Sequence, residues 1–402
     1  MVNASDKCIL IISVESPLSN CPGTIRLLAF IKGLKQSGWR PLLLTSCQSY
    51  EKERLDELGL RESIEIFHFE KWDASKIFSI KNIYPNFLMF PDRYWLCTFS
   101  AIKLVKSLMH SIKPKMIYTS FPHMTNHLIS LYISKKYNIP LITEFRDPLQ
   151  CYYNPGYRHY NYFMKKIELL IINNSKLVIH VTKEASNFYK KIYHNVVNKF
   201  HVIENGHSNT QGSSSSAIDK EIKIFQHSGS LYSDYRKVDQ LFMALKRLKY
   251  NNIISSENFR LVFRGEPPGT KTLELITKNE ILDIIDFKPK VSHLESFHEM
   301  QSSFVNVVIQ PEIFYLQIPS KIYQCIHANR PLLVITPKSG ATYNLAKNDN
   351  YCHLAWSQDE ICASITALIE DPNGFDPDKV DHFDYSLDTR ATDFIKLIES
   401  IV

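Results

Sequence analysis

The segment IPSKIYQCIHANRPLLVI, residues 318–335, has residue types and spacing suited to phosphate chemistry. Its Pro-Ser pair predicts a helix with Ser320 in the capping position and Lys321 in the first turn. A cation is unfavourable at this positive end of the helix dipole unless an anion lies nearby, whereas backbone N–H groups there bind phosphate well. Gln324 falls on the same helix face, where it could meet a sugar hydroxyl. The alternative is an exposed Lys321 and a half-buried Gln324 that bind nothing.

A second candidate phosphate site follows the apolar run that ends in QHSGS. Gly229 and Ser230 would let a ligand approach the backbone, and Arg236 could donate two hydrogen bonds to phosphate oxygens. Arg264 and Glu266, in FRGEPPG, follow another apolar run and are expected at the same edge of a sheet. A plain turn with a solvated arginine is the alternative. The chain has neither the P-loop spacing nor a GxGxxG motif, so a P-loop NTPase and a nicotinamide dehydrogenase are not supported.

Polar clusters also follow three predicted strands in the first half of the chain. Their members are Gly23, Thr24 and Arg26 after the first strand, His123 after a second, and Arg146 with Asp147 after a third. A single histidine beyond a strand is more often structural than chemical. Three clusters at successive strand ends favour a binding site.

Apolar runs that alternate with amphipathic segments must position these side chains. This pattern predicts an α/β fold of two Rossmann-like, doubly wound parallel-sheet domains, with a cleft between the carboxyl ends of their strands. The predicted strands are 8–14, 41–46, 64–69, 116–121, 140–145, 177–182, 222–230, 259–265, 284–289, 305–310 and 331–336, with 201–206 as a further candidate.

The domain boundaries follow from the same pattern. We expect an N-terminal Rossmann-like domain over 1–207 and a C-terminal Rossmann-like domain over 219–384. The low-complexity stretch SNTQGSSSS predicts a flexible linker over 208–218. Residues 385–402 predict an amphipathic helix that packs back toward the N-terminal domain.

Charge is distributed unevenly over the 402 residues. Residues 1–210 hold 27 Lys and Arg against 16 Asp and Glu, whereas residues 211–402 hold 20 against 25. A basic first half suits an anionic partner such as lipid head groups, with nucleic acid a weaker alternative. The basic, aromatic segments 152–172 and 188–200 fit a surface that lies against the inner face of a membrane, or ordinary helices with basic outer faces.

Two further features bear on location. The eight cysteines show no CxxC spacing, which favours neither a zinc site nor a disulfide framework and suits a reducing cytosol. No apolar run reaches the roughly 18 residues that a membrane span needs. We therefore expect a cytoplasmic protein, with peripheral attachment to the membrane as an option.

The ordered motifs PGTIR, TEFRDP, VIENG, HSGSLYSDYR, FRGE, VSHLESFHEM and IPSK extend over nearly the whole chain. In this order they resemble the bacterial glycosyltransferases of family 4 with the GT-B fold, in the branch with the FRDP signature that mostly builds surface polysaccharides. The resemblance implies transfer of a hexose-type sugar from a nucleoside diphosphate, with a UDP-sugar favoured, to a glycan or lipid-linked glycan. It also implies retention of anomeric configuration, no metal, no separate cofactor and no nucleic-acid partner.

The resemblance implies that the N-terminal domain, 1–207, binds the acceptor and that the C-terminal domain, 219–384, binds the nucleotide sugar. Arg236 and Lys321 would hold the donor diphosphate, the Gly23 loop would close over it, and Gln324 would replace the family's ribose-binding glutamate. The remaining donor-site candidates are Thr24, Gly229, Ser230, Arg264, Glu266 and Ser320. The catalytic candidates on the acceptor side are His123, Arg146 and Asp147.

The chain departs from the family pattern at three positions. The acidic pair eight residues apart is replaced by Leu316 and Gln324, and the tryptophan after FRDP by Leu149. A non-catalytic binding or partner protein with the same fold is therefore one alternative. A sugar-nucleotide epimerase is another, because it shares the two-domain architecture.

Overall fold

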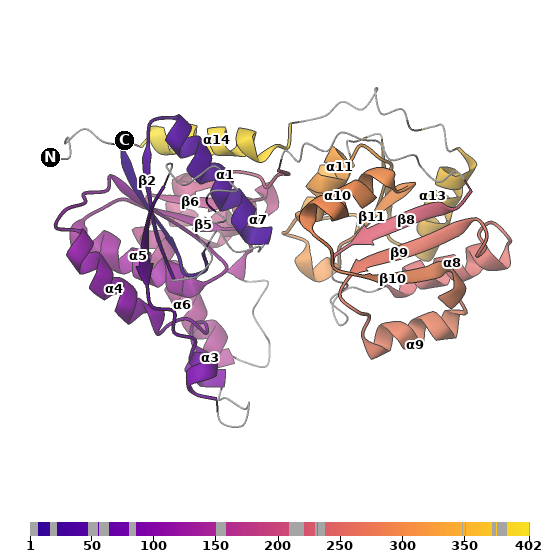
Figure 1. Cartoon of the computed structure of the whole chain (residues 1–402), viewed down its shortest axis with the longest axis horizontal. Helices are drawn as coiled ribbons and strands as arrows, with labels where there is room; N and C mark the ends of the chain where they lie inside the picture. Colours follow the sequence, from indigo (N-terminus) through magenta and orange to yellow (C-terminus); the bar gives the residue numbers. More distant parts are fainter. Residues whose placement is uncertain are drawn as a thin grey trace. The chain divides into compact units, whose positions relative to one another are not determined.

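The computed structural model describes residues 7–16, 22–46, 55, 64–79, 86–149, 158–208, 221–229, 231, 238–347, 349, 351–371, 375 and 384–401. The chain forms two compact units (Figure 1). Unit 1 comprises Met1–Asn205 with Ser386–Val402, and unit 2 comprises Gly206–Tyr385. The expected linker falls largely outside the described residues.

Unit 1 contains a seven-stranded parallel sheet in the order β3-β2-β1-β4-β5-β6-β7. The strand order changes direction between β1 and β4, which makes this the topological switch point where such sheets bind ligands. Both faces of this sheet carry apolar side chains, because helices pack against both of them. The strands are β1 (Cys8–Ser13), β2 (Arg40–Ser46), β3 (Glu65–Phe69), β4 (Met116–Ser120), β5 (Leu141–Phe145), β6 (Leu177–His180) and β7 (Phe200–Val202).

Two helical layers enclose this sheet. Figure 1 shows α1 and α14 on one face, while α4, α5, α6 and α7 contribute to the core on the other. The helices of unit 1 are α1 (Pro22–Gln36), α3 (Ala74–Ile77), α4 (Cys97–Leu108), α5 (Met124–Tyr137), α6 (Arg158–Asn174), α7 (Lys183–Ile192) and α14 (Leu387–Glu399), with 3-10 turns η1 (Asn86–Met89) and η3 (His194–Lys199).

The C-terminal helix α14 packs tightly on α1. The rings of Phe30 and Phe394 stack with centroids 4.5 Å apart. At Gly33, a Cβ atom would lie 2.9 Å from the Cβ of Ala391, closer than real Cβ contacts allow. Gly33 is therefore required by the close approach of the two helices.

Unit 2 contains a six-stranded parallel sheet in the order β10-β9-β8-β11-β12-β13, with its switch point between β8 and β11. The strands are β8 (Lys223–Ser228), β9 (Phe259–Gly265), β10 (Ile285–Pro289), β11 (Val305–Ile309), β12 (Leu332–Ile335) and β13 (Cys352–Ala355). The helices are α8 (Asp239–Tyr250), α9 (Thr270–Asn279), α10 (His293–Ser302), α11 (Lys321–His327), α12 (Ala341–Ala346) and α13 (Gln358–Glu370), with 3-10 turns η4 (Leu282–Ile284) and η5 (Glu312–Phe314).

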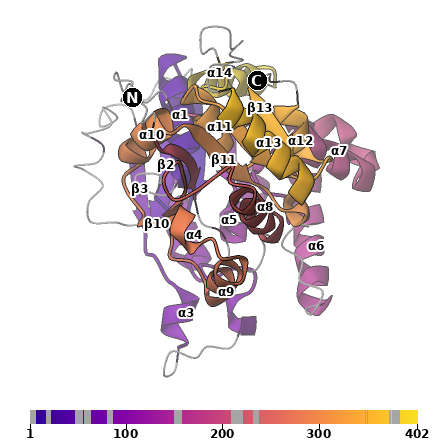
Figure 2. The ribbon, with the colours of Figure 1, turned by 90° about the vertical axis from the view of Figure 1, so that its right-hand side faces the viewer.

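Unit 2 also has a hydrophobic core on each face of its sheet. Residues of α8, α9 and α13 pack on one face of the sheet, and residues of α10, α11 and α12 pack on the other. Figure 2 shows α10 beside α11, as does Figure 1. The predicted fold class of two doubly wound parallel α/β domains is confirmed. The edge strand β13 was not predicted.

The contact between α1 and α14 can be tested at Gly33. Replacing Gly33 with leucine should destabilise unit 1 by roughly 1–3 kcal/mol, because the added side chain has to displace α14. Thermal or chemical unfolding followed by circular dichroism measures this change. In a Gly33→Ala background, Ala391→Gly should recover part of the loss, because it removes the conflicting Cβ. Equal stability of Gly33→Leu and the wild type would contradict the described packing.

Candidate functional site

Lys321 is the first residue of α11, directly after the N-cap Ser320. The Ser320 side chain makes no capping hydrogen bond, so the residue occupies the predicted cap position without the predicted interaction. Within the described residues, no hydrogen bond or ion pair holds the Lys321 ammonium group. Burial lowers the pKa of Lys321, and the charge of Lys290 lowers it further, although the nearby Cys325 opposes this effect. Lys321 is thus a half-buried cation whose charge no described carboxylate compensates.

Gln324 lies one turn further along α11 and meets a histidine that the sequence analysis did not single out. Gln324 Nε2 lies 2.5 Å from Nε2 of His293, the first residue of α10. Burial lowers the pKa of His293, and the charge of Lys321 lowers it further. A neutral His293 ring can accept the amide hydrogen of Gln324. His293, Lys321 and Gln324 therefore form one polar cluster between α10 and α11.

Arg264, at the end of β9, is already paired. Its Nε donates to Glu299 Oε2 at 2.8 Å, its second terminal nitrogen donates to Glu299 Oε1, and its remaining terminal nitrogen donates to the Pro289 carbonyl at 2.8 Å. Gln226 Nε2 donates to Glu299 Oε2 at 3.0 Å. Glu299 already compensates the charge of Arg264, whereas no described carboxylate compensates the charge of Lys321. Arg264 is therefore less available to bind a phosphate than Lys321.

The other donor-site candidates of unit 2 are more scattered. Gly229 follows β8 with φ at +149°, a conformation that L side chains rarely adopt, and its N–H donates to the Arg264 carbonyl at 2.9 Å. Glu266 is exposed. Ser230 and Arg236 lie outside the described residues.

In unit 1, His123 and Glu15 meet at the switch point between β1 and β4. His123 Nε2 and Glu15 Oε2 are 3.4 Å apart. The contact with His123 lowers the pKa of Glu15, against the opposing effect of burial. The edge of the Tyr94 ring contacts the His123 ring with centroids 4.9 Å apart, and the Tyr94 hydroxyl lies 3.5 Å from Glu15 Oε1. Glu15 and Tyr94 are the neighbours of His123 that the sequence did not indicate.

Arg146 and Asp147 follow β5, the next strand of the sheet. Arg146 Nε donates to the Phe121 carbonyl at 2.7 Å and so connects the chain after β5 to the chain after β4. Asp147 is partly buried. Leu149, where the family pattern has tryptophan, is buried, and its N–H donates to the Tyr189 hydroxyl at 3.1 Å.

A buried ion pair holds the start of α1. Arg26 donates to Glu144 Oε1 from Nε at 3.1 Å and from a terminal nitrogen at 2.8 Å, and to the carbonyls of Ile203 and Glu204. Burial alone would raise the pKa of Glu144, but the charge and hydrogen bonds of Arg26 outweigh it and hold this pKa below its usual value. The pair fixes the first turn of α1, which contains Gly23 and the buried Thr24.

Two buried histidines are unsuited to proton transfer at neutral pH. Burial lowers the pKa of both His127 and His180 to about 3. Both rings stack on Phe145 inside the core of unit 1. Among the described residues, no three His, Cys, Asp or Glu side chains gather as metal ligands, and no helix is long and apolar enough to cross a membrane.

Comparison with known proteins finds similarity in structure but not in sequence. No family model matches the chain, and no curated protein matches it. Sucrose-phosphate synthase from Thermosynechococcus elongatus superposes with a TM-score of 0.70 at 10% identity, covering 98% of this chain and 99% of that one. HepE from Anabaena in complex with UDP superposes with a TM-score of 0.65 at 13% identity, covering 98% and 100%.

The chain has the GT-B fold. A putative UDP-N-acetylglucosamine 2-epimerase from Listeria monocytogenes has the same architecture, with a TM-score of 0.62 at 9% identity over 98% of this chain and 96% of that one. The fold is therefore common to glycosyltransferases and to this putative epimerase, and the choice between them depends on the residues of the site.

The Arg26–Glu144 pair provides a stability test. Glu144→Ala should destabilise the protein by about 3–5 kcal/mol, because it leaves a buried guanidinium without its counter-charge. Glu399→Ala, which removes an exposed pair with Lys7 and a 3.3 Å hydrogen bond from Trp39 Nε1, should destabilise the protein far less. Chemical denaturation of both variants measures the difference.

The same pair should contribute to acid unfolding. The pKa of Glu144 is lowered in the folded state, so its stabilising effect is present above the unfolded-state pKa and is lost as the pH falls through the folded value. The stability of Glu144→Gln should consequently depend less on pH in the acid range. If Glu144→Ala lowers the free energy of unfolding no more than Glu399→Ala does, the pairing of Arg26 with Glu144 is wrong.

Proposed function

We propose that the chain is a glycosyltransferase that binds a nucleoside-diphosphate sugar through the cluster of His293, Lys321 and Gln324 in unit 2. The observation that carries the proposal is the half-buried, uncompensated ammonium group of Lys321. Burying a cation without a counter-charge costs free energy, and a diphosphate would supply the missing charge. HepE, which has been solved with UDP and with UDP-glucose, supports a UDP-sugar as the donor.

Each residue of this cluster has a chemical role in the proposal. Lys321 neutralises the diphosphate, whose charge grows as the sugar–phosphate bond breaks, so its effect is greatest in the transition state. Gln324, oriented by His293, hydrogen-bonds a hydroxyl of the nucleotide ribose. Ser320, Gly229, Glu266 and Arg264 are secondary candidates, together with Ser230 and Arg236 on the sequence pattern alone.

The acceptor side is assigned to unit 1. His123, Arg146 and Asp147 follow β4 and β5 beside the switch point, where parallel sheets bind ligands. The proposed acceptor is a glycan or a lipid-linked glycan of a surface polysaccharide. Family resemblance supports retention of configuration without a metal, and the leaving phosphate would then help to deprotonate the acceptor hydroxyl. A cytoplasmic enzyme at the inner face of the membrane fits this role.

Nucleotide binding is the first test. Thermal unfolding with UDP, GDP, CDP, ADP and TDP should show stabilisation by one of them, of about 2.7 kcal/mol at 100 times its dissociation constant. Lys321→Met should weaken this binding by roughly 10- to 100-fold, because a charge-assisted hydrogen bond is lost. Lys278→Met, at an exposed lysine of α9, is the matched control and should bind normally.

Lys321→Met should also be at least as stable as the wild type without nucleotide, because the substitution removes a buried cation. Stabilisation of both lysine variants by the nucleotide to the wild-type extent would refute the role of Lys321. A flat response of the wild type to all five nucleotides would refute the donor site.

The dependence of nucleotide affinity on pH is a second test. The pKa of free Lys321 is lowered below 10.5, and a bound diphosphate favours the charged form, so affinity should fall as the pH rises through the lowered pKa. Isothermal titration at several alkaline pH values measures this effect. The nucleotide affinity of Lys321→Met should not fall in this way at alkaline pH, whereas the affinity of Lys278→Met should fall as in the wild type.

Turnover separates the proposed transferase from the alternatives. A glycosyltransferase releases the nucleoside diphosphate when an acceptor is present, whereas a 2-epimerase converts UDP-N-acetylglucosamine into its C2 epimer without an acceptor. A binding protein would take up the nucleotide and consume no donor. Chromatography of the nucleotide products distinguishes the three outcomes.

A further inference from the structure

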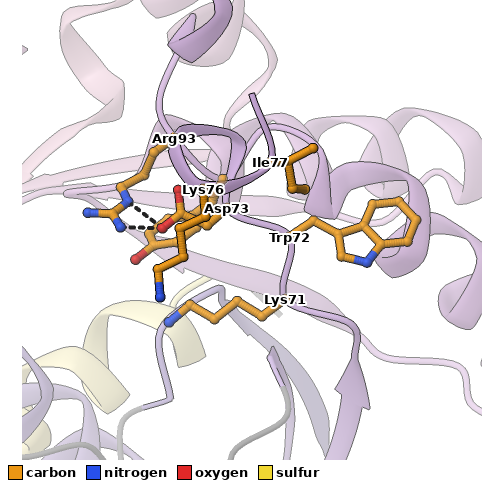
Figure 3. Close-up of a pocket in the computed structure, with 7 residues that line it drawn as sticks. Lys71, Trp72, Asp73, Lys76, Ile77 and Arg93 are labelled. Atoms are coloured by element: carbon orange, nitrogen blue, oxygen red, sulfur yellow. Dashed lines mark hydrogen bonds and ion pairs between the residues drawn. The ribbon is translucent and has the colours of Figure 1, made fainter. Parts of the chain in front are cut away.

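Unit 1 carries a cavity of about 390 Å³ that the proposed donor site does not use. Its lining comes from the chain around α3 and from the segment before α4 (Figure 3). Figures 1 and 2 both place α3 at the tip of unit 1 that is distant from α14. The lining residues are Lys71, Trp72, Asp73, Lys76, Ile77, Arg93 and Tyr94.

Three cations and one carboxylate give the cavity a net charge of +2. Asp73 is the carboxylate, and it is fully engaged: Oδ1 accepts the N–H and hydroxyl of Ser75, and Oδ2 accepts two N–H groups of Arg93. Neither Lys71 nor Lys76 forms an ion pair with a described carboxylate. In Figure 3 both ammonium groups extend to the side of the cavity where Arg93 lies. The lining of the cavity therefore carries an excess of positive charge, and the charge of Lys71 also acts on Glu15 beyond this lining.

The buried ring of Tyr94 connects this cavity to the catalytic candidates of unit 1. Lys71 Nζ lies 4.9 Å from the ring centroid and the Arg93 guanidinium carbon lies 5.2 Å from it. The same ring contacts His123, and its hydroxyl approaches Glu15. An anion held by the two lysines would consequently lie one aromatic ring away from His123.

The rim of the cavity is apolar and exposed. Trp72 is 37% exposed and Ile77 is 53% exposed, and Figure 3 shows both on the side away from the lysine ammonium groups. Elsewhere in unit 1, Phe99 of α4 is 61% exposed and contacts the ring of Trp95, while Phe163 of α6 is exposed and contacts the ring of Phe90. Exposed aromatic side chains beside lysines are typical of surfaces that enter the interface of an anionic membrane.

We propose that this cavity binds the phosphate group of a membrane lipid and so receives the lipid carrier of the acceptor. Lys71, Lys76 and Arg93 contact the phosphate, and Trp72 and Ile77 enter the layer of acyl chains beside it. The inference rests on the proposed function and extends it, because it makes the acceptor a phosphate-bearing lipid. It also places the acceptor's attachment point next to Tyr94, whose ring contacts His123.

Vesicle binding tests the proposal with the whole chain. Sedimentation with phosphatidylcholine vesicles, with and without phosphatidylglycerol, should show binding that requires the anionic lipid and weakens with salt. Lys71→Gln together with Lys76→Gln should weaken that binding by about 30-fold, the effect expected for two basic residues at an anionic surface. The matched control is Lys135→Gln with Lys136→Gln, an exposed lysine pair at the end of α5 that should change binding by less than about 3-fold.

Substitution in the apolar rim should affect vesicle binding in a different way from substitution of the lysines. Ile77→Ser should weaken vesicle binding at low and high salt alike, because the lost contribution is hydrophobic rather than ionic. The lysine variants should mainly reduce the dependence on salt.

Three outcomes would overturn the proposal. One is wild-type protein that does not bind anionic vesicles. Another is an equal loss in the control pair, which would indicate general charge attraction rather than this cavity. The third is that inorganic pyrophosphate stabilises the protein, that the Lys71 and Lys76 substitutions abolish this stabilisation, and that the protein does not bind vesicles. This result would indicate a soluble phosphorylated acceptor. The nucleotide-induced shift of the Lys71/Lys76 variant depends on Lys321 instead, so it reports separately on the proposed function.

Discussion

The organisation of unit 1 depends on one buried carboxylate. Glu144 accepts hydrogen bonds from Arg26, from the Tyr118 hydroxyl at 2.8 Å and from the Ser120 hydroxyl at 2.8 Å. Arg26 in turn donates to the chain after β7. Four segments that are distant in sequence are thereby fixed around one charge, just below the strand ends that carry the candidate residues. Buried charges are tolerated only when they are paired and hydrogen-bonded, and this pair meets both conditions.

The requirement that a buried charge be paired also distinguishes the cations of the molecule from one another. Arg26 and Arg264 are buried and each is paired with a glutamate, so their main contribution is to the geometry of the fold. Lys321 is half-buried without such a partner, and Lys71 and Lys76 surround a cavity whose one carboxylate is occupied. Charge that the fold leaves uncompensated is available to a ligand. By this criterion Lys321 in unit 2 and the lysines of the cavity in unit 1 are candidates for binding an anion.

The sequence predicted the architecture well because the central strands are continuous apolar runs separated by amphipathic helices. It missed β13, whose four residues include His353 at the edge of the sheet. The sequence also indicated Lys321 and Gln324, since both lie on one short helix. It could not indicate Glu144 or His293, which meet their partners across 118 and 31 residues, because such pairings exist only once the sheets have formed.

The packing of α14 on α1 has a consequence for how the protein is made. Unit 1 includes both Met1–Asn205 and Ser386–Val402, so unit 2 is inserted within it. On the ribosome, the last helix of unit 1 is synthesised only after all of unit 2. Until then the apolar face of α1, with Phe30 and Ile31, lacks its cover. Unit 2 can complete its own core first, so unit 1, which flanks unit 2 in the chain, completes its core after unit 2 has been synthesised.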